Sequence, residues 1–211
     1  MVKNVKYKHI VFDADGTLLD TEYAILLSLQ DTVKAFLHKE MEFEALKFCL
    51  GIPGDATLTQ LQVEDKQGAF NMWVDKLNDY YGHVKVFDGM REILDELKAQ
   101  GCTLGVVTSK NRFMYDKEFA EHGIIEYFGT SICEEDTVEH KPMPAPLFKY
   151  MELEGVSKED VLYIGDSKYD SMCAHGAGVD FALAVWGSHT KETPAQYYPE
   201  TPRELLQMIS E

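Results

Sequence analysis

Five short apolar runs are spread along the chain, and turn residues bound each of them. Runs of this length, rich in Val, Ile and Phe, predict buried strands. Segments with apolar residues at helical spacing separate most of the runs. Alternating strands and helices predict an α/β fold with a doubly wound, mostly parallel sheet. The predicted strands cover residues 8–12, 103–108, 128–132, 161–165 and 181–185.

The helical segments carry their own start and stop signals. Met90, Ile93, Leu94 and Leu97 share one helical face, and Gly101 follows as a stop. Near the end of the chain, Thr-Pro-Arg-Glu at residues 201–204 predicts a capping box that starts a last short helix. Further helices are predicted over residues 113–120, 147–153 and 169–174.

The segment between the first strand and Met90 has no convincing strand and is apolar at helical spacing instead. Glycines and a proline interrupt this pattern at residues 51–54. We expect a small helical domain over residues 19–85, inserted into an α/β core formed by residues 1–18 and 86–211. The hinges should lie near residues 18–20 and 81–86, and such an insert is well placed to act as a lid. The predicted helices of the insert cover residues 21–37, 43–50 and 57–81.

Composition limits the classes of protein. The 211 residues are 45% apolar, which is ordinary for a globular protein, and no stretch approaches the ~20 apolar residues of a membrane helix. The start of the chain shows no signal-peptide pattern, so we expect a cytoplasmic protein. A net charge of −16 argues against nucleic-acid binding. The four cysteines are widely spaced, which predicts reduced core residues and no zinc site.

The first predicted strand ends in Asp13-Ala14-Asp15-Gly16-Thr17. Carboxyl ends of parallel strands are where open α/β sheets bind ligands. The glycine and threonine allow the chain to turn, so that both carboxylates can face one site. Two such close anionic groups need a cation between them, and Mg²⁺ with phosphate oxygens fits. The alternative is a polar turn after a buried strand.

Three other segments place polar groups at neighbouring strand ends. Thr108 and Ser109 follow the second strand and could bind an anion or simply cap a helix. Lys141 precedes a proline, which favours an extended backbone and suits a phosphate or carboxylates, although a single lysine is usually solvated. Asp166 and Asp170 follow the fourth strand; Asp166 could bind the metal or cap a helix, and Asp170 could orient Lys141 or a metal-bound water. Their convergence at one edge favours a single site.

In order and spacing these four segments resemble the haloacid dehalogenase-like (HAD) hydrolase superfamily over nearly the whole chain. The resemblance implies a Rossmann-like core with a helical cap of the C1 type. Thr108-Ser109-Lys110, His140-Lys141-Pro142 and Trp186-Gly187 are similar to the phosphoglycolate phosphatase-like branch. The chain departs from that branch at Phe87-Asp88-Gly89, where a proline is common, and its cap is short.

The resemblance also implies a Mg²⁺-dependent phosphatase acting on a small phosphorylated metabolite, such as a phosphoglycolate-like compound or a sugar phosphate. Asp13 would be the nucleophile that forms an aspartyl-phosphate, and Asp15 the general acid and base. Lys141 would stabilise nucleophile and phosphate. The roles that remain are phosphate binding for Gly16, Thr17, Thr108 and Ser109, and metal binding for Asp13, the Asp15 carbonyl and Asp166.

Other activities stay open from the sequence. A phosphomutase resembling β-phosphoglucomutase would need the same core residues. Dehalogenation is disfavoured because it uses the aspartate without a metal, and a non-catalytic binding protein is disfavoured because the residue set is intact. Substrate choice is expected in residues 51–57, which could equally be a plain helix connection. The sequence indicates neither the substrate nor an oligomeric state.

Overall fold

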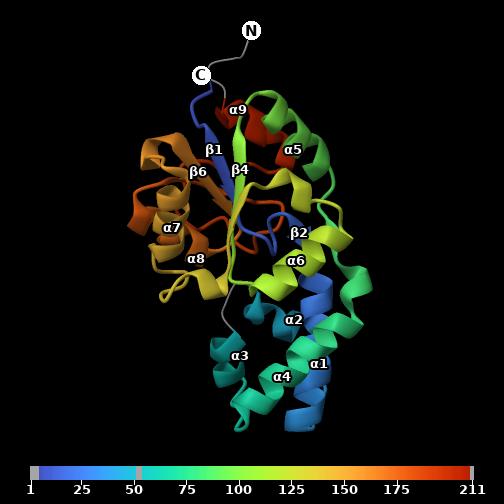
Figure 1. Ribbon diagram of the computed structural model, residues 1–211. Coiled ribbons are helices and arrows are strands. Elements are labelled where there is room, and N and C mark those ends of the chain that lie inside the picture. The colour runs from blue at the N-terminus through green and yellow to red at the C-terminus, as the bar shows by residue number, and fades with distance from the viewer. Residues whose placement is uncertain (1–4, 51–53, 210–211) are drawn as a thin grey trace. The chain divides into compact units, whose positions relative to one another are not determined.

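The computed structural model describes residues 5–50 and 54–209, and its main sheet has five parallel strands (Figure 1). The strand order is β5-β4-β1-β6-β7, and every neighbouring pair is parallel. The predicted α/β fold class is therefore confirmed. The strands are β1 (His9–Phe12), β4 (Thr103–Val107), β5 (Thr130–Ile132), β6 (Val161–Gly165) and β7 (Asp180–Leu183).

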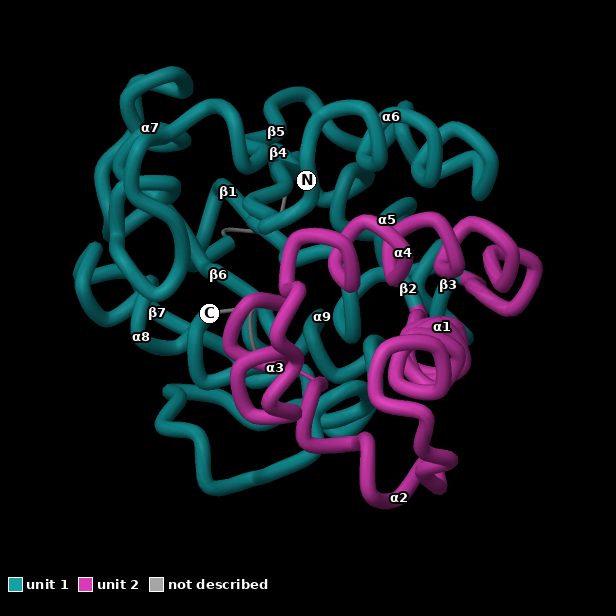
Figure 2. Tube along the Cα trace, turned by 90° about the horizontal axis from the view of Figure 1, so that it is seen from below, with its two compact units in different colours: residues 1–19, 86–211 teal, residues 20–85 magenta. Residues whose placement is uncertain are grey.

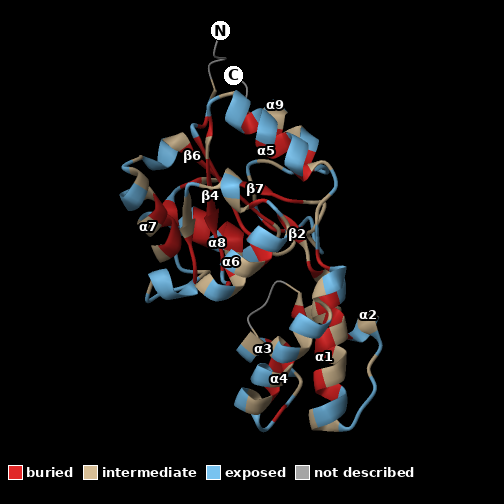
Figure 3. Ribbon diagram, turned by 45° about the vertical axis from the view of Figure 1, so that its right-hand side comes forward, coloured by how far each residue is buried: buried red, intermediate tan, exposed pale blue. Residues whose placement is uncertain are grey.

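Helices cover both faces of this sheet. On one face, α7 and α8 pack against β4 to β7 around buried side chains such as Val11, Tyr150 and Tyr163. On the other, α5 packs against β4 and α9 packs against α5, and Figure 3 shows the strands buried between these layers. The helices of this layer structure are α5 (Met90–Ala99), α6 (Arg112–Glu121), α7 (Ala145–Glu154), α8 (Lys168–Ala177) and α9 (Leu205–Ile209).

The strand register brings three strand ends to the same level. Phe12 of β1 is paired with Val106 of β4 on one side and Ile164 of β6 on the other. One residue further on, the backbone N–H of Asp13 still donates to the Ile164 carbonyl, at 2.8 Å. The residues that follow β1, β4 and β6 consequently meet at one edge of the sheet.

The chain divides into two compact units, coloured separately in Figure 2. Unit 1 consists of residues 1–19 and 86–211, and unit 2 of residues 20–85. Two strands at the crossings between the units, β2 (Leu19–Asp20) and β3 (Lys85–Val86), pair with each other in a separate small sheet. The sequence did not predict them, because two residues are too few to show a strand period.

Unit 2 is helical where the structure describes it. Its core packs α1 against α4, and the Trp73 indole N–H donates to the Ser28 hydroxyl at 3.0 Å. The prediction of one helix over residues 57–81 was wrong. The helix breaks at Gln62, which has a left-handed backbone (φ 59°), and restarts at Asp65, whose carboxylate accepts from the Gly68 N–H. The helices are α1 (Glu22–Leu37), α2 (Phe43–Leu46), α3 (Gly54–Gln60) and α4 (Lys66–Asp79).

Short 3₁₀ segments complete the chain. The last of them covers Pro202–Glu204, where the sequence predicted a capping box that does not form. Thr201 makes no side-chain cap; the Glu204 carboxylate instead accepts from the backbone N–H of Glu200, at 3.0 Å. The four cysteines are buried and free, as predicted. None of the described helices combines the length with the apolar character that a membrane span needs. The 3₁₀ segments are η1 (Lys47–Cys49), η2 (Tyr81–His83), η3 (Ile125–Tyr127), η4 (Glu134–Asp136), η5 (Lys158–Asp160) and η6 (Pro202–Glu204).

Candidate active site at the carboxyl ends of the strands

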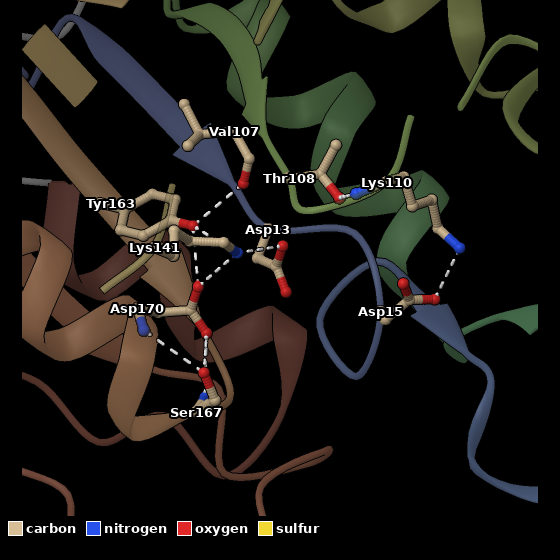
Figure 4. A network of polar contacts seen from close by, with 9 residues as sticks. All are labelled: Asp13, Asp15, Val107, Thr108, Lys110, Lys141, Tyr163, Ser167 and Asp170. Atoms are coloured by element: carbon tan, nitrogen blue, oxygen red, sulfur yellow. Dashed lines mark hydrogen bonds and ion pairs between the residues drawn. The ribbon is translucent and has the colours of Figure 1, made fainter. Parts of the chain in front are cut away.

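Lys141 lies at the centre of a buried polar network below the end of β1 (Figure 4). Its ammonium donates to Asp13 Oδ1 and to Asp170 Oδ1, both at 2.7 Å, and to the Tyr163 hydroxyl at 3.2 Å. Burial lowers the pKa of Lys141, but the two carboxylates raise it by more, so the net shift is upward. The lysine is thus a fixed cation that holds the end of β1 to α8.

Asp170 is fixed from three sides. It is the third residue of α8, where its Oδ2 accepts from the backbone N–H of Ser167 at 3.1 Å and completes a capping box. Its Oδ1 accepts from Lys141 and lies 2.9 Å from the Tyr163 hydroxyl. That hydroxyl also lies 3.0 Å from the Val107 carbonyl, so its single proton can be donated to either oxygen. With these bonds made, Asp170 is held in contact with the Lys141 ammonium.

The Asp13 and Asp166 side chains converge on one point. Carboxylate oxygens of Asp13, Asp166 and Asp170 lie within 4.8 Å of one another. Burial raises the pKa of Asp13 to about 7, against the opposing effect of Lys141. Burial also raises the pKa of Asp166 well above its usual value, and the nearby charges of Asp170 and Asp13 add to the rise. Hard oxygen ligands crowded in this way suit a Mg²⁺ ion, whose charge would relieve the repulsion.

The Asp15 side chain belongs to a second ion cluster. Its Oδ1 lies 2.9 Å from the ammonium of Lys110, which lies 2.6 Å from Glu118 Oε2. The side chains of Lys110 and Glu118 are 6% and 3% exposed. Asp15 thus directs one carboxylate oxygen toward Lys110. The metal role that the resemblance implies for its main-chain carbonyl stays a prediction.

The turn after Asp15 is closely packed. Gly16 has a left-handed backbone (φ 71°), and a Cβ there would lie 2.4 Å from Asp166 Oδ2. Thr17 is buried; its carbonyl accepts from the Trp186 indole N–H at 3.0 Å, and its hydroxyl oxygen has no hydrogen-bond partner among the described residues. Glycine at residue 16 is thus required both by the backbone and by the carboxylate beside it.

The two hydroxyl residues after β4 differ in their surroundings. Thr108 is buried and its hydroxyl accepts from the Lys110 N–H at 3.2 Å, as expected for a residue that caps a turn. Ser109 is exposed. Their binding to a phosphate stays a prediction.

Sequence reasoning overlooked three polar residues of this site. The sequence shows Lys110 only as part of the Thr108-Ser109-Lys110 motif. The structure buries it, and a buried lysine requires a carboxylate partner. Glu118 shares the buried face of α6 with Tyr115 and Phe119. An acidic residue at an otherwise apolar position of a helix indicates a buried ion pair, and this is the sequence feature that could have identified it. Tyr163 lies within β6, where a hydroxyl on a buried strand needs a polar partner.

A family model described as haloacid dehalogenase-like hydrolase matches residues 10–184. A protein of Caldanaerobacter subterraneus subsp. tengcongensis named "Putative pyrophosphatase PpaX" is 30% identical over 210 residues, which cover 97% of this chain and 96% of that protein. Pyrophosphatase PpaX of Bacillus velezensis is 28% identical over 198 residues, with 93% and 92% coverage. The matches thus extend over both compact units.

Solved structures share the fold. A protein of Lactobacillus plantarum described as a "putative phosphoglycolate phosphatase" has a TM-score of 0.89 at 24% identity, covering 97% of this chain and all of that one. A protein of Bacteroides fragilis described as a "Putative haloacid dehalogenase-like hydrolase" has a TM-score of 0.87 at 25% identity, covering 95% of this chain and 100% of that one. At such low identity the first likeness supports the architecture alone.

Proposed function

We propose that this chain, which belongs to the haloacid dehalogenase-like hydrolase family, transfers a phosphoryl group from a small anionic compound to Asp13 and then to water. Membership of a hydrolase family confirms the prediction that the chain is an enzyme. The observation that carries the proposal is the buried contact of Asp13 with Lys141, because this ammonium favours the ionised, nucleophilic form of the carboxylate.

The chemistry then runs in two steps. An Asp13 carboxylate oxygen attacks phosphorus, the bond between phosphorus and the leaving oxygen breaks, and Asp15 gives that oxygen a proton. Asp15 next takes a proton from water as the water oxygen attacks phosphorus, which frees Asp13 and releases phosphate. Lys141, fixed by Asp170, balances negative charge beside Asp13 throughout.

Asp13, Asp166 and the Asp15 carbonyl would hold a Mg²⁺ ion, and a bound Mg²⁺ supplies positive charge against the phosphate oxygens. We assign phosphate binding to Gly16, Thr17, Thr108 and Ser109, as the resemblance implies. We also propose that unit 2, residues 20–85, is the cap that selects the substrate. Part of the loop predicted to do this, residues 51–53, lies outside the described residues.

Two substrate classes fit this site. Phosphate monoesters of small metabolites follow from the resemblance to phosphoglycolate phosphatase-like proteins. Inorganic pyrophosphate is the second candidate. The observation that favours it is the similarity, over 97% and 93% of this chain, to proteins named "Putative pyrophosphatase PpaX" and "Pyrophosphatase PpaX". A phosphomutase would keep the phosphoryl group on a sugar, so it would release no phosphate.

The test is a panel of substrates incubated with purified protein and Mg²⁺, with free phosphate as the readout. The panel contains pyrophosphate, 2-phosphoglycolate, several sugar phosphates and 4-nitrophenyl phosphate. We expect phosphate release from at least one compound and its loss in EDTA. Isomerisation of a sugar phosphate without phosphate release would instead establish the phosphomutase.

Asp13→Asn is the matched variant for this panel. An amide of the same shape cannot attack phosphorus, so turnover should fall by about four orders of magnitude or more, as for other nucleophile replacements. Thermal unfolding checks that the variant is folded. Activity within about tenfold of the wild type would contradict the role of Asp13.

A further inference from the structure

The cluster of Asp15, Lys110 and Glu118 is separate from the network that holds the nucleophile. Figure 4 shows the Asp15–Lys110 pair to one side of Asp13, Lys141 and Asp170, and no hydrogen bond or ion pair joins the two groups among the residues drawn there. Each carboxylate of the proposed reaction thus has its own lysine: Lys141 for Asp13 and Lys110 for Asp15.

The backbone of Lys110 is fixed at both ends. Its N–H donates to the Thr108 hydroxyl at 3.2 Å, and its carbonyl accepts from the Glu134 N–H at 2.9 Å. Asn111, the next residue, caps α6 by accepting from the Met114 N–H at 2.8 Å. The Lys110 side chain therefore extends from a fixed backbone position between the end of β4 and the start of α6.

Glu118 fixes the other end of the lysine side chain. It lies two turns into α6, is 2% exposed, and contacts Lys110 at 2.6 Å. Burial of a carboxylate is costly, and the lysine already has a partner in Asp15. A second buried acid is therefore more than charge neutralisation requires, and its contact places the Lys110 ammonium between Glu118 and Asp15.

We propose that Lys110 and Glu118 are positioning residues that hold the Asp15 carboxyl group for proton transfer to the leaving oxygen and from water. The inference rests on the proposed function. It predicts that the two residues affect steps in which Asp15 moves a proton, and leave attack by Asp13 nearly intact. A purely structural ion cluster would instead affect every substrate alike.

The experiment compares Lys110→Met and Glu118→Gln with the wild type on two substrates. 4-Nitrophenyl phosphate has a good leaving group and needs little protonation, whereas glycerol 2-phosphate has an alkoxide leaving group that needs a proton. We expect kcat/KM for the alkyl substrate to fall about tenfold further than for the aryl substrate in Lys110→Met, with a smaller difference in Glu118→Gln. Lys110→Arg should restore most of the loss.

A double-mutant cycle with Asp15→Asn identifies the residue through which Lys110 acts. If Lys110 works through Asp15, Lys110→Met should cost less than about threefold in the Asp15→Asn background. Because the hydrolytic step loses its base, rapid-quench mass spectrometry of Lys110→Met should also find a phosphoryl group on the peptide containing Asp13. Lys98→Met on the exposed side of α5 is the control, and should match the wild type on both substrates.

Three results would overturn the proposal: equal losses on both substrates, full additivity with Asp15→Asn, or no trapped intermediate. Because Lys110→Met leaves two carboxylates without their cation, Lys110→Met/Glu118→Gln is a second variant with less buried charge, and the same substrate ratio is expected of it. Failure of the proposed function is distinguishable, since the wild type would then release no phosphate from any substrate.

Discussion

At the scale of single residues, the site contains more negative than positive charge. Two buried ammonium groups contact four carboxylates, and Asp166 adds a fifth beside them. Such an excess costs stability unless a cation compensates it. We therefore assign the crowded carboxylates to the proposed metal site rather than to a role in folding. Burial raises the pKa of Asp166 well above its usual range, and the nearby charges of Asp170 and Asp13 add to the rise.

Asp166→Asn separates metal binding from folding. The amide keeps the shape next to Gly16 and removes one charge, so the metal-free variant should unfold at the same or a higher temperature than the metal-free wild type. Mg²⁺ at a hundred times its Kd should stabilise the wild type by about 2.7 kcal/mol and the variant by much less. Differential scanning calorimetry with EDTA and with Mg²⁺ measures both effects. Equal stabilisation of the two proteins by Mg²⁺ would contradict the assignment.

At the scale of elements, the loop after β7 supports the proposed catalytic loop after β1. The Trp186 indole holds the Thr17 carbonyl, and the Ala184 N–H donates to the Gly165 carbonyl at 2.8 Å. A Cβ on Gly187 would lie 1.8 Å from the carbonyl oxygen of Gly16. The two loops therefore pack backbone against backbone, which only glycine permits at residue 187.

Gly187→Ala should push the Gly16 carbonyl out of place and disturb Asp15 and Thr17 on either side. Overpacking against backbone typically costs about 1–3 kcal/mol, so we expect a lower unfolding temperature together with a large loss of kcat. Gly129→Ala is the matched control, because a Cβ there meets nothing within 4 Å. The packing argument would be wrong if both variants had wild-type unfolding temperatures.

Periodic elements could be predicted from the sequence, and elements fixed by single contacts could not. The stripe from Met90 to Leu97 predicted α5, because one helical face is buried along its whole length. The break after Gln62 carries no Gly or Pro signal and depends on the cap at Asp65. The proximity of Asp13 and Asp166 could also be predicted, because both residues follow neighbouring parallel strands. The contact of Lys110 with Glu118 could not, because it depends on how α6 packs.

At the scale of the whole molecule, the net charge of −16 opposes the approach of an anionic substrate. The lysines of the site are buried and already paired with carboxylates, so they contribute little positive field outside it. The repulsion acts over the Debye length, which is about 30 Å at 10 mM salt and about 8 Å at 150 mM. Substrate association should therefore be slowed most at low ionic strength.

We expect kcat/KM for a phosphate monoester to rise about two- to fivefold as NaCl increases from 10 to 150 mM at constant Mg²⁺. Since screening affects only the encounter, kcat should stay constant. Pyrophosphate carries more negative charge and should show a steeper rise than the monoester. Initial-rate measurements in NaCl and in sodium acetate of equal ionic strength separate screening from specific binding of chloride. A fall of kcat/KM with salt would mean that local positive charge near the site outweighs the field of the whole protein.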